Sequence, residues 1–313
     1  MLLQWKGYGV DVKPKKSDKH TFAEMMNRRS LLGMALAAAV AGRAGAAAHG
    51  ASGLKSLQKK IGGRLGVHIL DSQSGKRIAF NDDARFAMAS TFKLPLAAGL
   101  LWQVDHGAFP LGHTLPIGKK DVLPNSPMVE PFVAQGGGEM TVRELCIAAV
   151  TYSDNAAANV LLQGIGGPAA LTSFVRSIGD EVTRFDRTEP DLNSNQPGDE
   201  RDTTTPRAMV ETLLKIFTQD VLSLGSRALL IDWMIASRTG LDRVRKGLPK
   251  GWHSGDKTGT GENGAVNDLL ITWPPERRPI IAAIYMSESA KSTQELTAAH
   301  AEIGALIERE KWP

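Results

Sequence analysis

Apolar residues in the first part of the folded region follow a helical period and then a strand period. Ser52–Ile61 has apolar positions at helical spacing, which predicts a helix. Leu65–Leu70 is a short apolar run typical of a strand, and the polar stretch 71–75 after it predicts a turn. Arg77–Phe80 then predicts the second strand of an antiparallel hairpin.

The pattern stays helical over a long central stretch, from residue 90 to about residue 234. Pro168 and Pro206 predict two helix starts within it, because a residue without an N–H group is tolerated in the first turn. Arg227–Ile235 predicts the last apolar helix of this stretch.

Three runs with strand character follow, and one helical segment ends the chain. The strand-like runs are His253–Thr260, Asn267–Trp273 and Ile280–Ser287. Ser292–Glu310 predicts the terminal helix. Strands therefore occur on both sides of a long helical insert.

This order predicts an α/β (α+β) fold, in which an antiparallel sheet is flanked by the N- and C-terminal helices and lies next to an all-helical lobe. The predicted α/β lobe consists of residues 49–88 and 236–313, and the helical lobe consists of residues 89–235. Pockets concentrate between such units, so we expect the functional site in the cleft between the lobes.

The first 48 residues are expected to lie outside this fold. Asn27-Arg28-Arg29 followed by an Ala-rich run resembles a twin-arginine export signal, and the uncharged stretch is too short to span a bilayer. Cleavage is expected after Ala48, and translation could start at Met25 or Met26. The alternative is an apolar N-terminal helix that stays in the fold.

Net charge gives no indication of a nucleic-acid partner. The chain of 313 residues carries a formal charge of +4, but the first 48 residues hold eight basic side chains against three acidic ones. The predicted mature part therefore has a small negative balance rather than a basic excess.

The chain contains one cysteine, Cys146, so no intramolecular disulfide is possible. It lies in an apolar helical stretch that begins with a predicted capping box, Thr141 to Glu144. We expect a buried, unreactive thiol. With no cysteine near the cleavage site, we also expect no lipid anchor on the mature protein.

Four short motifs occur in a fixed order along the chain. They are Ser90-Thr91-Phe92-Lys93, Ser153-Asp154-Asn155, Glu189-Pro190-Asp191-Leu192-Asn193 and Lys257-Thr258-Gly259. The bare Ser-x-x-Lys pattern also occurs at residues 52, 56 and 254, so it has little weight alone. Only Ser90 directly precedes a buried helix and has the other motifs in order after it.

The position of Ser90 suits a nucleophile. A serine at the start of a helix lies near unpaired backbone N–H groups, and a lysine three residues later lies on the same helix face. Lys93 is therefore within reach of the Ser90 hydroxyl. A serine hydroxyl is almost inert at neutral pH and needs such a nearby base.

With these motifs, residues 52–312 resemble a class A serine β-lactamase, and the motif set is the established one for that family. The resemblance implies the serine β-lactamase/penicillin-binding fold and hydrolysis of penicillins and cephalosporins. It implies that Ser90 is acylated. Either Lys93, or Glu189 acting through water, is the base for acylation, and the sequence leaves both open.

The resemblance also implies roles for the remaining motif residues. Glu189 would activate the water that removes the acyl group, with Asn193 holding that water. Ser153 would protonate the departing nitrogen, and Asn155 would bind the acylamino side chain of the substrate. The substrate carboxylate would be bound by Lys257, Thr258 and Thr260, with Gly259 allowing a close approach.

Further implied features concern backbone and loop geometry. The N–H groups of Ser90 and Thr260 would form the oxyanion hole. Arg187 would pair with Asp202 to close the loop that carries Glu189, and the Glu189-Pro190 bond is a candidate cis peptide. Asp154 is expected to be structural. Lys257 is expected to add positive charge that lowers the pKa of Lys93.

One departure from the family pattern concerns the guanidinium that helps to bind the carboxylate. Some members have an arginine seven residues after the Lys-Thr-Gly glycine, where this chain has Val266. We expect Arg243, on the loop before the strand, to replace it. The alternative is that Arg243 is a solvated loop residue.

Other classes fit less well. A penicillin-binding D,D-peptidase shares three of the motifs but lacks a carboxylate equivalent to Glu189, and a catalytically inactive β-lactam sensor usually belongs to a membrane receptor. The seven histidines form no cluster with metal-ligand spacing, and no phosphate-binding loop occurs, so no metal or cofactor is expected. The resemblance favours a monomer exported to the periplasm.

Overall fold

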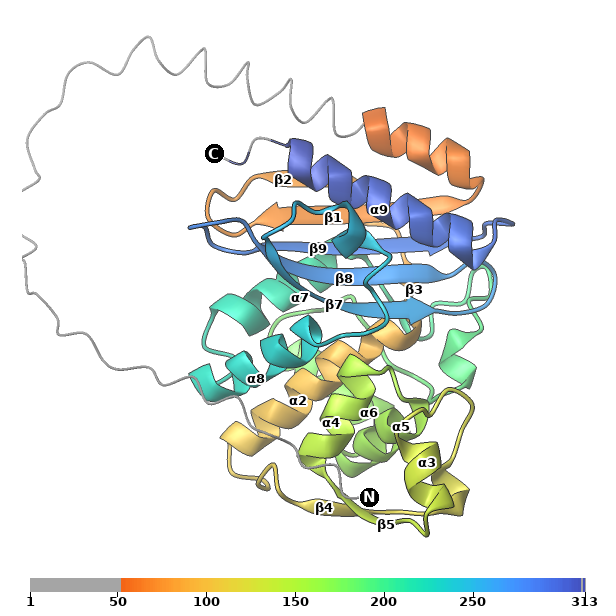
Figure 1. Cartoon of the computed structure of the whole chain (residues 1–313), viewed down its shortest axis with the longest axis vertical. Coiled ribbons are helices and arrows are strands. Elements are labelled where there is room, and N and C mark those ends of the chain that lie inside the picture. The colour runs from red at the N-terminus through yellow and green to blue at the C-terminus, as the bar shows by residue number, and fades with distance from the viewer. Residues whose placement is uncertain (1–51, 311, 313) are drawn as a thin grey trace, which may run out of the picture. The chain divides into compact units, whose positions relative to one another are not determined.

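A five-stranded antiparallel sheet lies at the centre of the fold (Figure 1). The strand order is β2-β1-β9-β8-β7, so the first strand pairs with the last one. The strands are β1 (Arg64–Asp71), β2 (Arg77–Phe80), β7 (His253–Thr260), β8 (Val266–Trp273) and β9 (Ile280–Ser287). The predicted hairpin and the three late strands are confirmed, and β8 begins one residue earlier than expected.

The computed structural model describes residues 52–310 and 312. The predicted export signal and its cleavage site lie outside the described residues and stay predictions. The described residues belong to one compact unit, Gly42–Pro313. The division of that unit into lobes at residues 88 and 235 also stays a prediction.

Both faces of the sheet are buried at its centre, which explains why β9 is apolar almost throughout. Every residue of β9 is buried. Ala283 and Tyr285 contribute to the hydrophobic core on one face, while Ile284 and Met286 contribute to the core on the other. Since successive side chains of a strand point to opposite faces, both sets must be apolar.

Helices from the two ends of the described chain cover one face of the sheet (Figure 1). Residues 52–61 are helical, and α9 (Thr293–Arg309) ends the fold. Ser292 and Glu295 form a capping box at the start of α9, which satisfies backbone N–H groups that would otherwise lack a partner. The predicted flanking by both terminal helices is confirmed.

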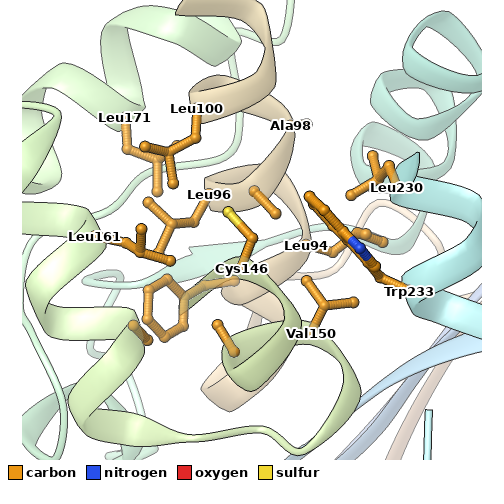
Figure 2. Packing of buried hydrophobic residues seen from close by; sticks show 14 of the residues in the cluster. Leu94, Leu96, Ala98, Leu100, Cys146, Val150, Leu161, Leu171, Leu230 and Trp233 are labelled. Carbon is orange, nitrogen blue, oxygen red and sulfur yellow. The ribbon is translucent and has the colours of Figure 1, made fainter. Parts of the chain in front are cut away.

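Helices from the middle of the chain form the core on the other face. They are α2 (Lys93–Asp105), α3 (Val129–Ala134), α4 (Val142–Thr151), α5 (Asn155–Gly164), α6 (Gly167–Ser177), α7 (Pro206–Thr218) and α8 (Leu224–Ile235). Figure 2 shows side chains of α2 packed among residues of α4, α5, α6 and α8. The predicted helix starts at both prolines are confirmed.

The central stretch is not helical throughout, which corrects one part of the expectation. It also contains β4 (Thr114–Ile117), which pairs with β5 (Gly138–Thr141), and β6 (Thr203–Thr204), which pairs with β3 (Phe86–Ala87). β4 and β5 have four residues each with exposed or mixed faces, and β3 and β6 have only two residues each, so all four carry almost no periodic signal.

Cys146 lies in α4 and is fully buried (Figure 2). Burial raises the pKa of its thiol to about 12. The predicted capping box at Thr141 is present at the start of the same helix. The thiol is therefore protonated and inaccessible at neutral pH, as the sequence predicted.

Among the described residues, no helix combines the length and apolar character needed to cross a membrane.

Asp154 joins two helices through a buried carboxylate. Its Oδ1 accepts from the Ala157 N–H (2.9 Å) and caps α5, while its Oδ2 accepts from the N–H groups of Met128 (2.8 Å) and Val129 (3.0 Å) at the start of α3. We expect Asp154→Ala to lower the free energy of unfolding by roughly 3 kcal/mol or more, because each buried donor left without an acceptor costs about 1–3 kcal/mol.

Urea unfolding measures this loss, and Thr141→Ala is the matched control. Thr141 also caps a helix, but its bonds are exposed, so its loss should cost only about 1 kcal/mol. Equal losses in the two variants would show that Asp154 is no more than a surface cap.

Candidate active site

A cavity of about 640 Å³ collects polar residues from several distant segments of the chain. It is lined by Ser90, Asn125, Ser126, Pro127, Glu130, Tyr152, Ser153, Asn155, Asn193, Thr239, Arg243, Thr258 and Thr260. Seven of the eleven predicted site residues belong to this lining. The other four, Lys93, Glu189, Lys257 and Gly259, adjoin it through the contacts described below.

Ser90 and Lys93 meet one turn apart, as the sequence predicted. Ser90 lies in the short helix η1 (Ala89–Phe92), and Lys93 is the first residue of α2. The Lys93 Nζ donates to Ser90 Oγ (2.9 Å) and to the side-chain oxygen of Asn155 (2.6 Å). It also donates to the backbone carbonyl of Ser153 (2.7 Å). These bonds fix the ammonium next to the hydroxyl.

Two non-glycine residues beside the cavity have left-handed backbone conformations. Ala89, directly before the serine, has φ 45°, and Ser153 has φ 60°. Such conformations cost of order 1–3 kcal/mol and cluster at functional sites. Here they allow the turn that presents Ser90 and the turn that presents Ser153.

Glu189 contacts both members of the serine–lysine pair. Its Oε1 accepts from Ser90 Oγ (3.2 Å) and lies 3.0 Å from Lys93 Nζ. Its Oε2 accepts from the Asn193 side chain (2.5 Å), which is in the one-turn helix η3 (Asp191–Asn193). The Glu189-Pro190 peptide is cis, as expected.

The loop from residue 184 to residue 202 is closed by the expected pair. Arg187 Nε lies 2.6 Å from Asp202 Oδ2. The other oxygen of Asp202 accepts from the backbone N–H groups of Asp186 (2.8 Å) and Arg187 (3.0 Å). These contacts therefore join the beginning and the end of the loop that carries Glu189.

Asn159 is a positioning residue that the sequence interpretation missed. Its side chain accepts from the Glu189 N–H (2.9 Å) and donates to the Glu189 carbonyl (2.8 Å), so it holds the backbone of that residue on both sides. The available signal was its spacing: Asn159 follows Asn155 by four residues and therefore lies on the same face of α5.

Strand β7 supplies the opposite wall of the cavity. Lys257 Nζ donates to Ser153 Oγ (2.9 Å), and the hydroxyls of Thr258 and Thr239 are 2.6 Å apart. A Cβ atom at Gly259 would lie 2.7 Å from the Met88 carbonyl oxygen. Only glycine therefore lets β7 pack this closely against the segment that carries the serine.

Arg243 is buried beside the cavity, so the alternative of a solvated loop residue is wrong. Its guanidinium donates to the carbonyl oxygens of Gly259 (2.9 Å) and Asn267 and to Thr260 Oγ1 (2.7 Å). Val266, in the position where some relatives have an arginine, is a buried core residue. Arg243 thus brings a positive charge to the end of β7.

The two site lysines have lowered pKa values. Burial lowers the pKa of Lys93, and the Glu189 carboxylate opposes this shift. Burial, and then the charge of Lys93, lower the pKa of Lys257 well below its usual value. Repulsion between two cations is mutual, so the expected contribution of Lys257 to the lowered pKa of Lys93 stays a prediction beside the effect of burial.

No metal centre is evident in the described part of the chain. No group of three or more His, Cys, Asp or Glu residues within 52–310 and 312 could hold a metal ion.

These contacts define the class of protein. A serine hydroxyl bonded to a lysine and a carboxylate, with a second serine bonded to a second lysine, is the arrangement of a serine acyl-transfer enzyme of the penicillin-recognising fold.

Comparison with known proteins identifies the family. The model of the β-lactamase enzyme family matches residues 51–310. The chain is 42% identical over 253 residues to β-lactamase CTX-M-97 of Escherichia coli (80% of this chain, 86% of the relative). It is 41% identical over 287 residues to β-lactamase L2 of Stenotrophomonas maltophilia (90% and 94%).

A solved structure agrees with the same assignment. The last common ancestor of Gram-negative bacteria β-lactamase class A has a TM-score of 0.79 at 53% identity, covering 81% of this chain and 96% of that one. The chain belongs to the β-lactamase enzyme family and is a class A member.

The Lys93 ammonium gives a direct test of this geometry. We expect it to titrate below the ordinary lysine value of 10.5, and Glu189→Gln to lower its pKa further, because the variant removes the carboxylate charge that opposes the shift. NMR titration of protein labelled at the lysine ε-carbon measures both values, with the signal assigned by its loss in Lys93→Arg. An unchanged or raised pKa in Glu189→Gln would contradict the contact between the two side chains.

Proposed function

We propose that this chain hydrolyses the β-lactam ring of penicillins and cephalosporins through a covalent acyl-enzyme on Ser90, and so confers β-lactam resistance. The observation that carries this proposal is the Glu189 carboxylate, held 3.2 Å from Ser90 Oγ and bonded to Asn193. A carboxylate in that position can deliver water to an ester on the serine. Family membership and the names of the relatives support the substrate class.

Acylation would begin with attack of Ser90 Oγ on the lactam carbonyl carbon. The hydroxyl proton passes directly to Lys93 when that side chain is in its neutral amine form, or to Glu189 through a water molecule. The backbone N–H groups of Ser90 and Thr260 would stabilise the oxyanion, a contribution worth about 10²–10³ in rate for one donor. The carbon–nitrogen bond then breaks, and Ser153 protonates the nitrogen. Lys257, bonded to Ser153 Oγ, is placed to replace that proton.

Deacylation would use Glu189 as the general base. The carboxylate takes a proton from water, and the resulting hydroxide attacks the ester carbon. Ser90 leaves with a proton, and the ring-opened acid is released. Asn193 would hold the water together with Glu189, since its side chain is already bonded to that carboxylate.

Substrate binding would depend on the positive end of the cavity. Lys257, Thr258, Thr260 and Arg243 would bind the carboxylate shared by penicillins and cephalosporins. Asn155 would form a hydrogen bond with the acylamino group of the substrate on the other side of the cavity. Gly259 keeps the strand edge free of a side chain that would obstruct the substrate.

We also propose that the protein is exported by the twin-arginine route, is cleaved after Ala48 and acts as a periplasmic monomer without a membrane anchor. The support is the sequence motif together with the export that is typical of the family. If the proposal holds, replacing both Arg28 and Arg29 by Lys leaves a full-length precursor in the cytoplasm, which fractionation and immunoblotting detect. Unchanged export and processing of that variant would disprove the twin-arginine route.

Removing the proposed deacylation base is the central test. Glu189→Ala should slow steady-state turnover of a chromogenic cephalosporin by roughly 10²–10⁴-fold, the usual contribution of a general base. Intact-mass analysis should then find a stable adduct on Ser90. The control is Ser90→Ala, which should form no adduct.

The same variant decides between the open alternatives. Rapid adduct formation in Glu189→Ala would assign the acylation base to Lys93, and very slow formation would assign it to Glu189. A stoichiometric burst and a long-lived adduct in the unmodified protein would instead indicate a penicillin-binding D,D-peptidase. That result would overturn both the proposed hydrolysis and the role of Glu189.

A further inference from the structure

The active-site cavity carries opposite charges on two of its sides. Of the described residues that line it, only Arg243 and Glu130 have charged side chains. Arg243 donates to the Gly259 carbonyl and to Thr260 Oγ1, so it belongs to the side that is assigned to the substrate carboxylate. Glu130 has no role in the reaction as it is proposed above, although its side chain borders the same cavity.

Glu130 lies on the side of the cavity that would receive the acyl side chain of the substrate. Asn155, which is assigned to the acylamino group, donates from its side chain to the Pro124 carbonyl (2.9 Å) and from its backbone to the Asn125 carbonyl (3.0 Å). The next residue, Ser126, accepts the backbone N–H of Glu130 (2.9 Å) through its own carbonyl. Glu130 therefore lies one helical turn beyond the segment that contacts Asn155.

The Glu130 carboxylate is free to contact a ligand. Glu130 is the exposed second residue of α3. Its side chain takes part in no hydrogen bond or ion pair with any residue of the described ranges 52–310 and 312. An acid in the first turn of a helix also interacts favourably with the helix dipole. The structural alternative is therefore that Glu130 only stabilises the start of α3.

The other charged groups near the cavity leave this negative charge uncompensated. Lys93 and Glu189 lie 3.0 Å apart, so their charges largely cancel. Lys257 is on β7 and adds to the positive side, together with Arg243. The charged residues of the short helix η2 (Lys119–Asp121) precede this segment in the chain, but none of them lines the cavity.

We propose that Glu130 makes this site selective for β-lactams with a cationic acyl side chain, such as an ammonium group on the carbon next to the amide carbonyl. The inference rests on the proposed function, which supplies the orientation of the substrate. With the substrate carboxylate at Arg243, the acyl side chain passes Asn155 toward Glu130. An ammonium group there is attracted by an unpaired carboxylate, whereas a second carboxylate on the substrate is repelled by it.

Three penicillins that differ in the substituent on one carbon test this preference. Ampicillin has an ammonium group there, penicillin G a hydrogen atom and carbenicillin a carboxylate. The kcat/KM values for ampicillin and for carbenicillin are each divided by the value for penicillin G in the same preparation, so that a general loss of folded protein cancels. At a pH of about 6 the amino group is protonated, because an α-amino group ordinarily has a pKa of about 7.7–8.0.

Glu130→Gln should lower the ampicillin ratio and raise the carbenicillin ratio by roughly 2–5-fold each, the size expected for an exposed ion pair. Glu130→Lys should move both ratios further in the same directions. Both effects should shrink at high salt, because exposed charges are screened. Ratios that stay unchanged in Glu130→Lys, or that move together in one direction, would overturn the proposal and leave Glu130 as a helix-start acid.

Glu308→Gln is the matched control. Glu308 is also an exposed helical glutamate, but it belongs to α9 and does not line the cavity. Its replacement changes the net charge of the protein by the same amount as Glu130→Gln. Both ratios should therefore stay unchanged in this variant, and a shift like that of Glu130→Gln would show that the net charge of the protein, rather than Glu130, sets the preference.

The same measurements separate a failure of this inference from a failure of the proposed function. If the unmodified protein hydrolyses penicillin G but the ratios do not respond to Glu130, only this inference is wrong. If penicillin G instead forms a long-lived adduct, the proposed hydrolysis is wrong, and the second-order rate constants of adduct formation give the same two ratios. A protein that neither hydrolyses penicillin G nor forms an adduct with it would overturn both.

Discussion

The contact that the rest of this structure depends on is the buried triangle of Ser90, Lys93 and Glu189. The lysine ammonium lies 2.9 Å from the serine hydroxyl and 3.0 Å from the carboxylate, and neither charged side chain has any exposed surface. A buried charge without its partner is strongly destabilising, so each of the two charged groups makes the other possible. The Ser90 hydroxyl therefore has both a cation and a base beside it, which the hydroxyl of a solvated serine lacks.

Holding this triangle together explains much of the fold around it. The lysine is fixed by an apolar helix packed on all sides, and the carboxylate is fixed by a loop whose ends are tied by Arg187 and Asp202 and whose backbone is held by Asn159. Strand β7 completes the site, and Gly259 allows it to approach the serine closely. Strain at Ala89 and at Ser153 remains in the folded state because these surrounding contacts over-determine it.

Much of this was predictable because the relevant signals are local. The strands β1, β2 and β9 follow short-range apolar patterns, and the capping box at Thr141 needs only four consecutive residues. The short strands β4 and β5 were missed, because their pairing depends on residues more than twenty positions apart. Asn159 was missed for a related reason: its function lies in a contact with a loop thirty residues away.

The sequence by itself determined which reactive side chains are present, their order along the chain and the periodicity of the helices and strands that carry them. Side-chain chemistry and the spacing of helix or strand positions are properties of neighbouring residues. The tertiary structure alone decided the electrostatics. It buried Arg243 beside neutral oxygens, placed Asp256 diagonally from Asp268, and brought Lys93 and Lys257 close enough for their charges to repel. These effects depend on distance and on exclusion of water, and both are fixed only when remote segments of the chain pack together.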